Sequence, residues 1–166
     1  MKTYVLTVSR NFPKTHTKSG EQTFFKEKLT NGLAQLKGDN CKIHTIRSNA
    51  KLWEKRISEI QKGNAILSIR YWSDKPYNSK QVEICQLDKN SGIGTQLLYF
   101  DSVTLCEGKE TPLYATVYEP FKYKFSPNLK DLAFNDGLSV EDFKEWFKKP
   151  SLLGDFVIIH FTSFRY

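Results

Sequence analysis

The chain has 166 residues, enough for one domain to bury a core without disulfides or a bound metal. Its three cysteines are odd in number and widely spaced, which argues against a disulfide framework and a structural zinc site. The formal net charge is +7, and residues 1–80 hold 16 Lys and Arg against 6 Asp and Glu. Such a basic half attracts phosphate-bearing ligands, although it also fits a surface that only aids solubility.

In the first half of the chain, the apolar spacing predicts an order of strand, helix, strand, helix and strand. These elements are expected at residues 4–8, 21–36, 42–47, 50–61 and 65–72. Gly32 lowers the helix propensity of the first helix and is a possible early end for it. Ser48 and Asn49 are suitable N-caps for the second helix.

The second half of the chain is richer in strands. They are expected at residues 81–87, 95–104, 113–118 and 156–161, and residues 119–130 are expected to be irregular. Ser139 and Asp142 form a start similar to a capping box for a short amphipathic helix. The run from 156 to 161 is continuously apolar, which indicates a strand buried on both faces. We therefore expect an α+β domain with mostly antiparallel strands, two or three helices and a closed or nearly closed barrel.

The strand at residues 42–47 carries more polar side chains than a core strand needs. Lys42, His44, Thr45 and Arg47 stand among isoleucines that anchor the strand. The pattern predicts an edge that presents cations and a hydroxyl to an anionic or carbonyl-bearing ligand; a half-exposed strand with solvated charges is the alternative. On a regular strand Lys42 and Thr45 face opposite sides, so they can meet only if the strand begins or bulges near Lys42.

Further candidates for ligand binding lie around the loop that follows residue 72. The aromatic residues Tyr71, Trp72 and Tyr77 flank a basic loop, and aromatic faces beside cations suit base stacking with phosphate contacts. Ordinary packing at strand ends is the alternative. The predicted ligand-binding set is Arg47, His44, Arg70, Trp72, Lys75 and Tyr77.

The histidines give no metal-binding pattern such as HxxxH, so we expect neither a metal nor a cofactor. His160 lies in the apolar run and is expected in the core or in a pocket wall. His44 either joins the Lys42 site or bonds to a neighbouring strand. The opening segment, MKTYVLTVSR, is too short and polar for a signal peptide, and no apolar run approaches about 18 residues. We therefore expect a cytoplasmic protein that does not associate with membranes.

Three segments in this order resemble one known family. They are Phe24-Phe25 with a helix, Gly38 and Lys42-x-x-Thr45-x-Arg47; residues 131–139 with the helix at 141–148; and the closing strand at 156–161. Together they resemble the ASCH family, which belongs to the PUA-like superfamily. The resemblance implies one domain over residues 1–166, a mostly antiparallel PUA-like β-barrel with flanking helices and a long insertion at roughly 73–130.

The same resemblance implies a cleft that accepts RNA, a nucleotide or a modified nucleoside. Compact bacterial members of the family are amidohydrolases that act on acetylcytidine, and other members are ribonucleases or RNA-binding modules. The working residues of the amidohydrolases correspond here to Lys42, Thr45 and Asp136, with aspartate in place of the family's glutamate.

These residue types suit hydrolysis. A threonine hydroxyl needs a base beside it, and a desolvated lysine can lose its proton and serve as that base. Arg47 would offer a cation to a phosphate or an oxyanion, and Asp136 could orient Lys42 or relay a proton. The expected function is therefore binding of RNA or a modified nucleoside, with hydrolysis of an acylated nucleoside or RNA as an open extension. A non-catalytic RNA-binding module is the alternative.

Overall fold

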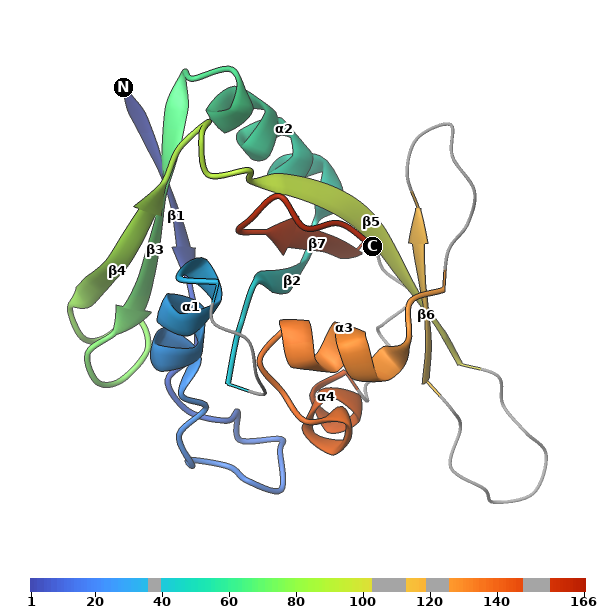
Figure 1. Ribbon diagram of the computed structural model, residues 1–166. Helices are drawn as coiled ribbons and strands as arrows, with labels where there is room; N and C mark the ends of the chain where they lie inside the picture. Colours follow the sequence, from blue (N-terminus) through green and yellow to red (C-terminus); the bar gives the residue numbers. More distant parts are fainter. Residues whose placement is uncertain (36–39, 103–112, 119–125, 148–155) are drawn as a thin grey trace.

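The computed structural model describes residues 1–35, 40–102, 113–118, 126–147 and 156–166 (Figure 1). The strands are β1 (Lys2–Thr7), β2 (His44–Ser48), β3 (Ala65–Trp72), β4 (Gln81–Leu87), β5 (Gly94–Ser102), β6 (Leu113–Tyr118) and β7 (Phe156–His160). The helices are α1 (Phe25–Leu33), α2 (Ala50–Gln61), α3 (Leu129–Asn135) and α4 (Val140–Trp146). Gly38 and residues 103–112 and 119–125 of the predicted insertion lie outside the described residues. None of the four described helices has the length and apolar character needed to span a membrane.

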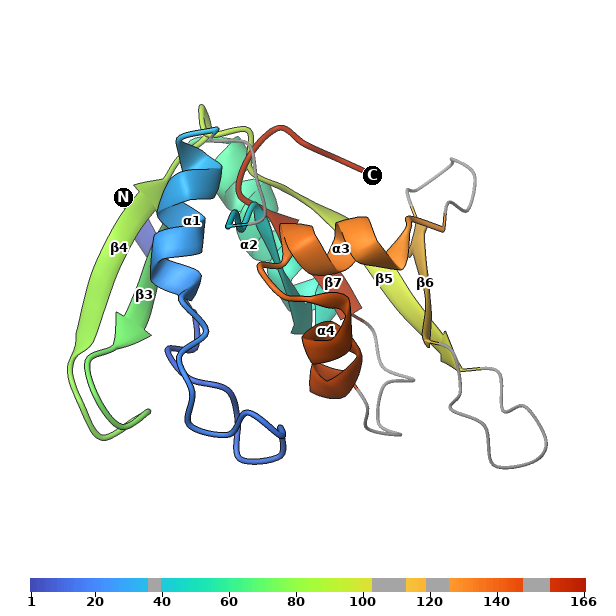
Figure 2. The same ribbon diagram turned by 60° about the horizontal axis from the view of Figure 1, so that its bottom comes forward.

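The strands form two sheets. The first has the order β1-β3-β4, with β1 parallel to β3 and β4 antiparallel to it. The second has the order β2-β7-β5-β6, and all of its pairs are antiparallel. Figures 1 and 2 show α1 beside the first sheet and α3 with α4 beside the second. The predicted α+β class is therefore confirmed.

The predicted PUA-like barrel is wrong. Among the described strands neither sheet closes on itself, and four helices are present rather than two or three. A link between the two sheets is made by a side chain: Arg47 Nη2 donates a hydrogen bond to the carbonyl oxygen of Thr7 over 2.5 Å. A bond of this kind does not continue a backbone ladder, so β1 and β2 remain in separate sheets.

Several elements form where the local sequence predicts them. The side chain of Asn49 accepts a hydrogen bond from the Leu52 amide and caps α2 at the expected start. Ser139 caps α4 in the same way, through the amide of Asp142. In β7 the residues at 157–160 are fully buried, as expected for a strand covered on both faces.

Helix α1 is shorter than the predicted helix at 21–36. Phe24 adopts a left-handed conformation with φ 56°, so regular helix begins only after it. Gly32 lies near the other end, where a Cβ atom would approach the Lys42 carbonyl oxygen to 2.4 Å. The glycine therefore allows residues 42–43 to pass directly against α1.

Helix α3 was not predicted. Asn128 caps it by accepting from the Lys130 amide, and its buried face consists of Leu132 and Ala133. The prolines that precede it indicated irregular structure, although a helix start tolerates a proline just before the cap.

Candidate functional site

Lys42 and Asp136 form a buried ion pair. Lys42 Nζ lies 2.6 Å from Asp136 Oδ1 and also donates to the Asp136 carbonyl oxygen. The two side chains are 1% and 7% exposed. Because both charges have left water, the pair depends on this close geometry.

The backbone on both sides holds the pair in place. The Lys42 amide donates to the Lys28 carbonyl of α1, and the Ile43 amide donates to the Asn135 carbonyl at the end of α3. Gly137 follows Asp136 with φ +80°, and a Cβ atom there would lie 3.2 Å from the Cβ of Lys42. A glycine thus suits both the turn and the close approach of Lys42.

Thr45 and Arg47 line the same small cavity as Lys42 and Asp136. Strand β2 begins at His44, so Lys42 lies outside the regular strand and is not bound to the alternation that separates it from Thr45. Lys42 and Thr45 can meet only because the strand begins after Lys42. We call this space the Lys42 cavity; its volume of about 20 Å³ is enough for roughly one water molecule.

Burial shifts both members of the ion pair toward their neutral forms. Desolvation lowers the pKa of Lys42 to about 8, against the attraction of Asp136 and with help from Arg47 and Lys28. Desolvation also raises the pKa of Asp136, against the attraction of Lys42 and Arg47. Lys42 therefore loses its proton far more readily than an exposed lysine.

His44 lies beside Asp136, and it is on the opposite face of β2 from its neighbour Thr45. Its Nδ1 is 3.8 Å from Asp136 Oδ1, and its Nε2 is 2.7 Å from the hydroxyl of Tyr166. Asn135 Nδ2 donates to the same hydroxyl over 2.8 Å. Burial, followed by the charges of His160 and Lys42, holds the pKa of His44 well below its ordinary value. His44 is thus a neutral neighbour of the ion pair.

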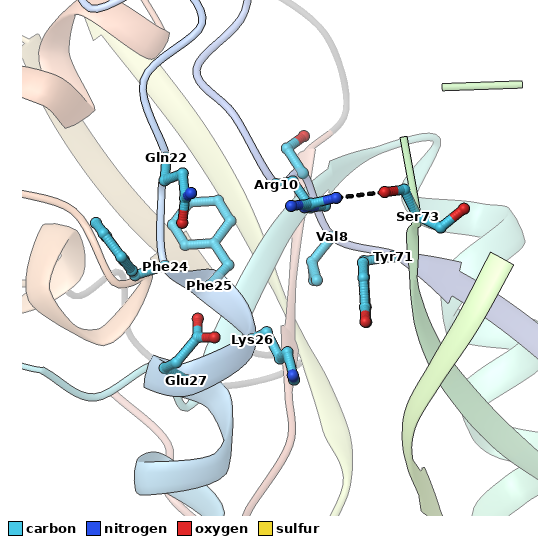
Figure 3. A pocket seen from close by; sticks show the side chains of 10 residues that line it. Val8, Arg10, Gln22, Phe24, Phe25, Lys26, Glu27, Tyr71 and Ser73 are labelled. Carbon is cyan, nitrogen blue, oxygen red and sulfur yellow. Dashed lines mark hydrogen bonds between the residues drawn. The ribbon is translucent and has the colours of Figure 1, made fainter. Parts of the chain in front are cut away.

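A larger pocket lies next to the Lys42 cavity. Figure 3 shows it between the start of α1 and the ends of β1 and β3. It is lined by Val8, Ser9, Arg10, Gln22, Phe24, Phe25, Lys26, Glu27, Tyr71 and Ser73, and its volume is about 190 Å³. We call it the Tyr71 pocket. Val8, Ser9 and Phe25 line both spaces, so the two are neighbours.

The Tyr71 pocket combines aromatic and cationic groups. Arg10 Cζ lies 5.9 Å and Lys26 Nζ 5.8 Å from the centroid of the Tyr71 ring. Arg10 is held by a hydrogen bond to the Ser73 carbonyl oxygen (Figure 3). Phe24 is 55% exposed, and its positive φ is uncommon for a bulky residue. Strained residues of this kind concentrate at functional sites.

The predicted residues of the β3–β4 region divide between two sides of the strand. Tyr71 reaches the pocket, whereas Arg70 and Trp72 alternate with it and face away. Arg70 bonds to Ser68 and lies 3.7 Å from Glu83, and the ring of Trp72 packs against that of Tyr77. Five of the six residues predicted to bind ligand line neither space; only Arg47 does, and the other five are His44, Arg70, Trp72, Lys75 and Tyr77.

Two pocket cations, Arg10 and Lys26, were missed by the sequence analysis. Neither belongs to a motif, since the pocket forms only when the segment before α1 folds against β3. Tyr166 and Asn135 were missed for the same reason, because long-range packing brings them to His44. Within the described ranges, no three His, Cys, Asp or Glu side chains gather as a metal site.

No protein-family model, curated protein or solved structure matches this chain. The resemblance to the ASCH family therefore stays a prediction.

Proposed function

We propose that this protein binds RNA or a modified nucleoside, with one base in the Tyr71 pocket. The observation that carries the proposal is an aromatic ring, Tyr71, flanked by two cations, Arg10 and Lys26. Both cations lie over the ring, so a base that stacks on Tyr71 moves at least one of them aside, where it meets the phosphate or ribose. The volume of about 190 Å³ is below the roughly 300–1,000 Å³ of sites for drug-sized ligands, which favours a single base.

Charge around the pocket supports the same ligand. The excess of Lys and Arg lies in residues 1–80, the part of the chain that contributes the pocket walls. Arg47 adds a further cation at the neighbouring Lys42 cavity. A nucleotide in the pocket would thus meet further polar groups on its way to Lys42.

Binding is tested by the fluorescence anisotropy of a labelled single-stranded RNA at low salt. Tyr71→Ala is expected to weaken binding by about 1–3 kcal/mol, the range for a lost stacking contact. Tyr99→Ala is the control, because Tyr99 is a tyrosine that is 41% exposed but lies on β5, whereas Tyr71 is half-buried on β3. Equal losses in both variants, or no binding by the wild type, would overturn the proposal.

We propose as a second function that the Lys42 cavity hydrolyses a small acyl group on the bound nucleoside. The observation that favours it is the shared cavity of Lys42, Thr45 and Asp136, with the pKa of Lys42 lowered to about 8. Thr45 Oγ attacks the acyl carbonyl while neutral Lys42 accepts the hydroxyl proton. Arg47 stabilises the oxyanion that forms.

The reaction then runs through an acyl-threonine. The bond from carbonyl carbon to the leaving amine breaks, and Lys42 returns the proton to that amine. Water hydrolyses the ester on Thr45 and restores the hydroxyl. The cavity, at about 20 Å³, holds roughly one water, so an acetyl group enters only if that water leaves and the lining side chains shift, and a bulky acyl group is excluded.

Hydrolysis is tested with acetylcytidine and benzoylcytidine as substrates. Only the acetyl compound is expected to react, and Lys42→Ala is expected to abolish turnover. Lys51→Ala is the matched control, since Lys51 is exposed on α2. If neither compound reacts while nucleoside binding persists, the protein is a non-catalytic binding module.

A further inference from the structure

His44 carries a buried polar atom that the proposed reaction leaves unexplained. Its Nδ1 has no hydrogen-bond partner among the described residues, and the whole residue is 0% exposed. Folded proteins rarely leave a buried nitrogen unpaired, because the lost hydration is then not replaced. Such an atom therefore calls for a physical reason.

The position of this atom suggests the reason. Nδ1 lies 3.8 Å from Asp136 Oδ1, which in turn lies 2.6 Å from Lys42 Nζ. On the other side of the ring, Nε2 lies 2.7 Å from the hydroxyl of Tyr166. Lys42, Asp136, His44 and Tyr166 thus form a file from a fully buried amine to a half-buried hydroxyl, with one gap in its hydrogen bonds, the 3.8 Å between Asp136 and His44.

We propose that His44 is a positioning residue that passes protons between Asp136 and Tyr166, so that buried Lys42 exchanges its proton with solvent. The inference rests on the proposed hydrolysis, because that reaction needs Lys42 to be neutral. Lys42 itself is 1% exposed and has little direct access to water.

The proton steps balance along the file. Lys42 gives a proton to Asp136 Oδ1, and a small side-chain movement brings the carboxyl group to His44 Nδ1, which takes the proton. His44 releases its Nε2 proton to the oxygen of Tyr166. The hydroxyl proton of Tyr166, which is directed at the Asp131 carbonyl oxygen over 3.4 Å, turns from that oxygen and passes to water. Lys42 ends neutral, Asp136 ends ionised, and His44 ends as its other neutral tautomer.

The groups that face His44 fit this role. They are Asp136, Lys42, His160 and Tyr166. Burial, with the positive charge of Lys42 as a smaller cause, keeps the pKa of the imidazole low and the ring neutral between transfers. His160 provides a contrast. It is equally buried and both of its ring nitrogens are unpaired among the described residues, but its ring contacts are with His44, Phe164 and Tyr166. His160 is therefore a matched control.

The test measures hydrogen exchange of the Lys42 ammonium group by NMR in substrate-free protein with 15N-labelled lysine. The measurement is made near pH 6, below the pKa of about 8. His44→Gln keeps a donor or acceptor for Tyr166 but cannot pass a proton. It is expected to slow the exchange by about tenfold or more. His160→Gln is expected to leave the exchange rate unchanged.

Tyr166→Phe is the second variant, because it removes a single oxygen at the half-buried end and leaves the imidazole in place. It is expected to slow the exchange as His44→Gln does. Unchanged exchange in both variants, or equal slowing in His160→Gln, would overturn the inference. Since no substrate is present, this result is independent of whether hydrolysis is found.

Discussion

Gly32 lies so close to the Lys42 carbonyl oxygen that a Cβ atom on Gly32 would approach it to 2.4 Å. This contact lets the chain before β2 lie flat on α1 and directs Lys42 toward Asp136. Glycine at this position lowers the helix propensity by about 1 kcal/mol relative to alanine, but any larger side chain would collide with the Lys42 carbonyl oxygen.

We expect Gly32→Ala to destabilise the protein by about 1–3 kcal/mol, since overpacking outweighs the gain in helix propensity. Urea unfolding gives the free energy of unfolding. Thr30→Ala, two residues earlier on the exposed side of α1, is the control and should have little effect. A more stable Gly32→Ala protein would show that residues 42–43 do not press on the helix.

The Lys42–Asp136 pair predicts strong coupling in a double-mutant cycle. Removal of either partner leaves a buried group without its counterion, so Lys42→Met and Asp136→Asn should each cost about 3–5 kcal/mol. The double variant should cost clearly less than the sum of the two single variants. Additive losses would mean that the two side chains do not interact in solution.

The buried histidines predict a loss of stability in mild acid. Burial, with the charge of Arg165, lowers the pKa of His160 to about 3, whereas in the unfolded chain it is near 6.5. Between these values the unfolded state binds more protons, so the free energy of unfolding falls as the pH falls. The slope is about 1.4 kcal/mol per pH unit for each histidine.

His160→Phe should flatten this decline by about 1.4 kcal/mol per pH unit between pH 6 and 4.5, measured by urea unfolding at several pH values. Exposed carboxylates whose pKa values are lowered, such as that of Asp88, lose their contribution only nearer pH 4. Asp136, whose pKa is raised, is common to both proteins, so the difference between wild type and variant in this window isolates His160. An identical decline in the variant would show that His160 is protonated in the folded state.

The pH dependence of hydrolysis follows from Lys42. Because the neutral amine is the base, kcat/KM should rise with pH and level off above about 8. The attraction of Asp136 raises the pKa of Lys42, so Asp136→Asn should move the midpoint to lower pH while it reduces the rate. A profile that falls through pH 8, or a midpoint that moves upward, would contradict the role of Lys42.

Local signals in the sequence account for much of the fold. Asn49 marks the start of α2, and the apolar run of β7 identifies a doubly covered strand. Barrel closure could not be judged in this way, because it depends on whether β1 and β2 pair through their backbones. The contact that forms instead, from the Arg47 side chain to Thr7, has no local signature.

The candidate site was predicted in part. The resemblance to the ASCH family brought together Lys42 and Asp136, which are 94 residues apart, and the structure places them in contact. Arg10 and Lys26 were not predicted as ligand-binding residues, because they reach the Tyr71 pocket only when the segment before α1 folds against β3. Trp72 was predicted to bind ligand because it precedes a basic loop. The side chains of a strand alternate between its two faces, and Tyr71 rather than Trp72 is on the face that lines the pocket.

The central claim is that a nucleoside binds in the Tyr71 pocket. The most direct measurement is a titration of 15N-labelled protein with cytidine and acetylcytidine, followed by amide chemical shifts. We predict saturable shifts at Val8, Arg10, Lys26 and Tyr71, which line the pocket. Acetylcytidine should also shift Thr45 in the Lys42 cavity. No shifts, or shifts confined to a surface away from this pocket such as that of α2, would contradict the claim.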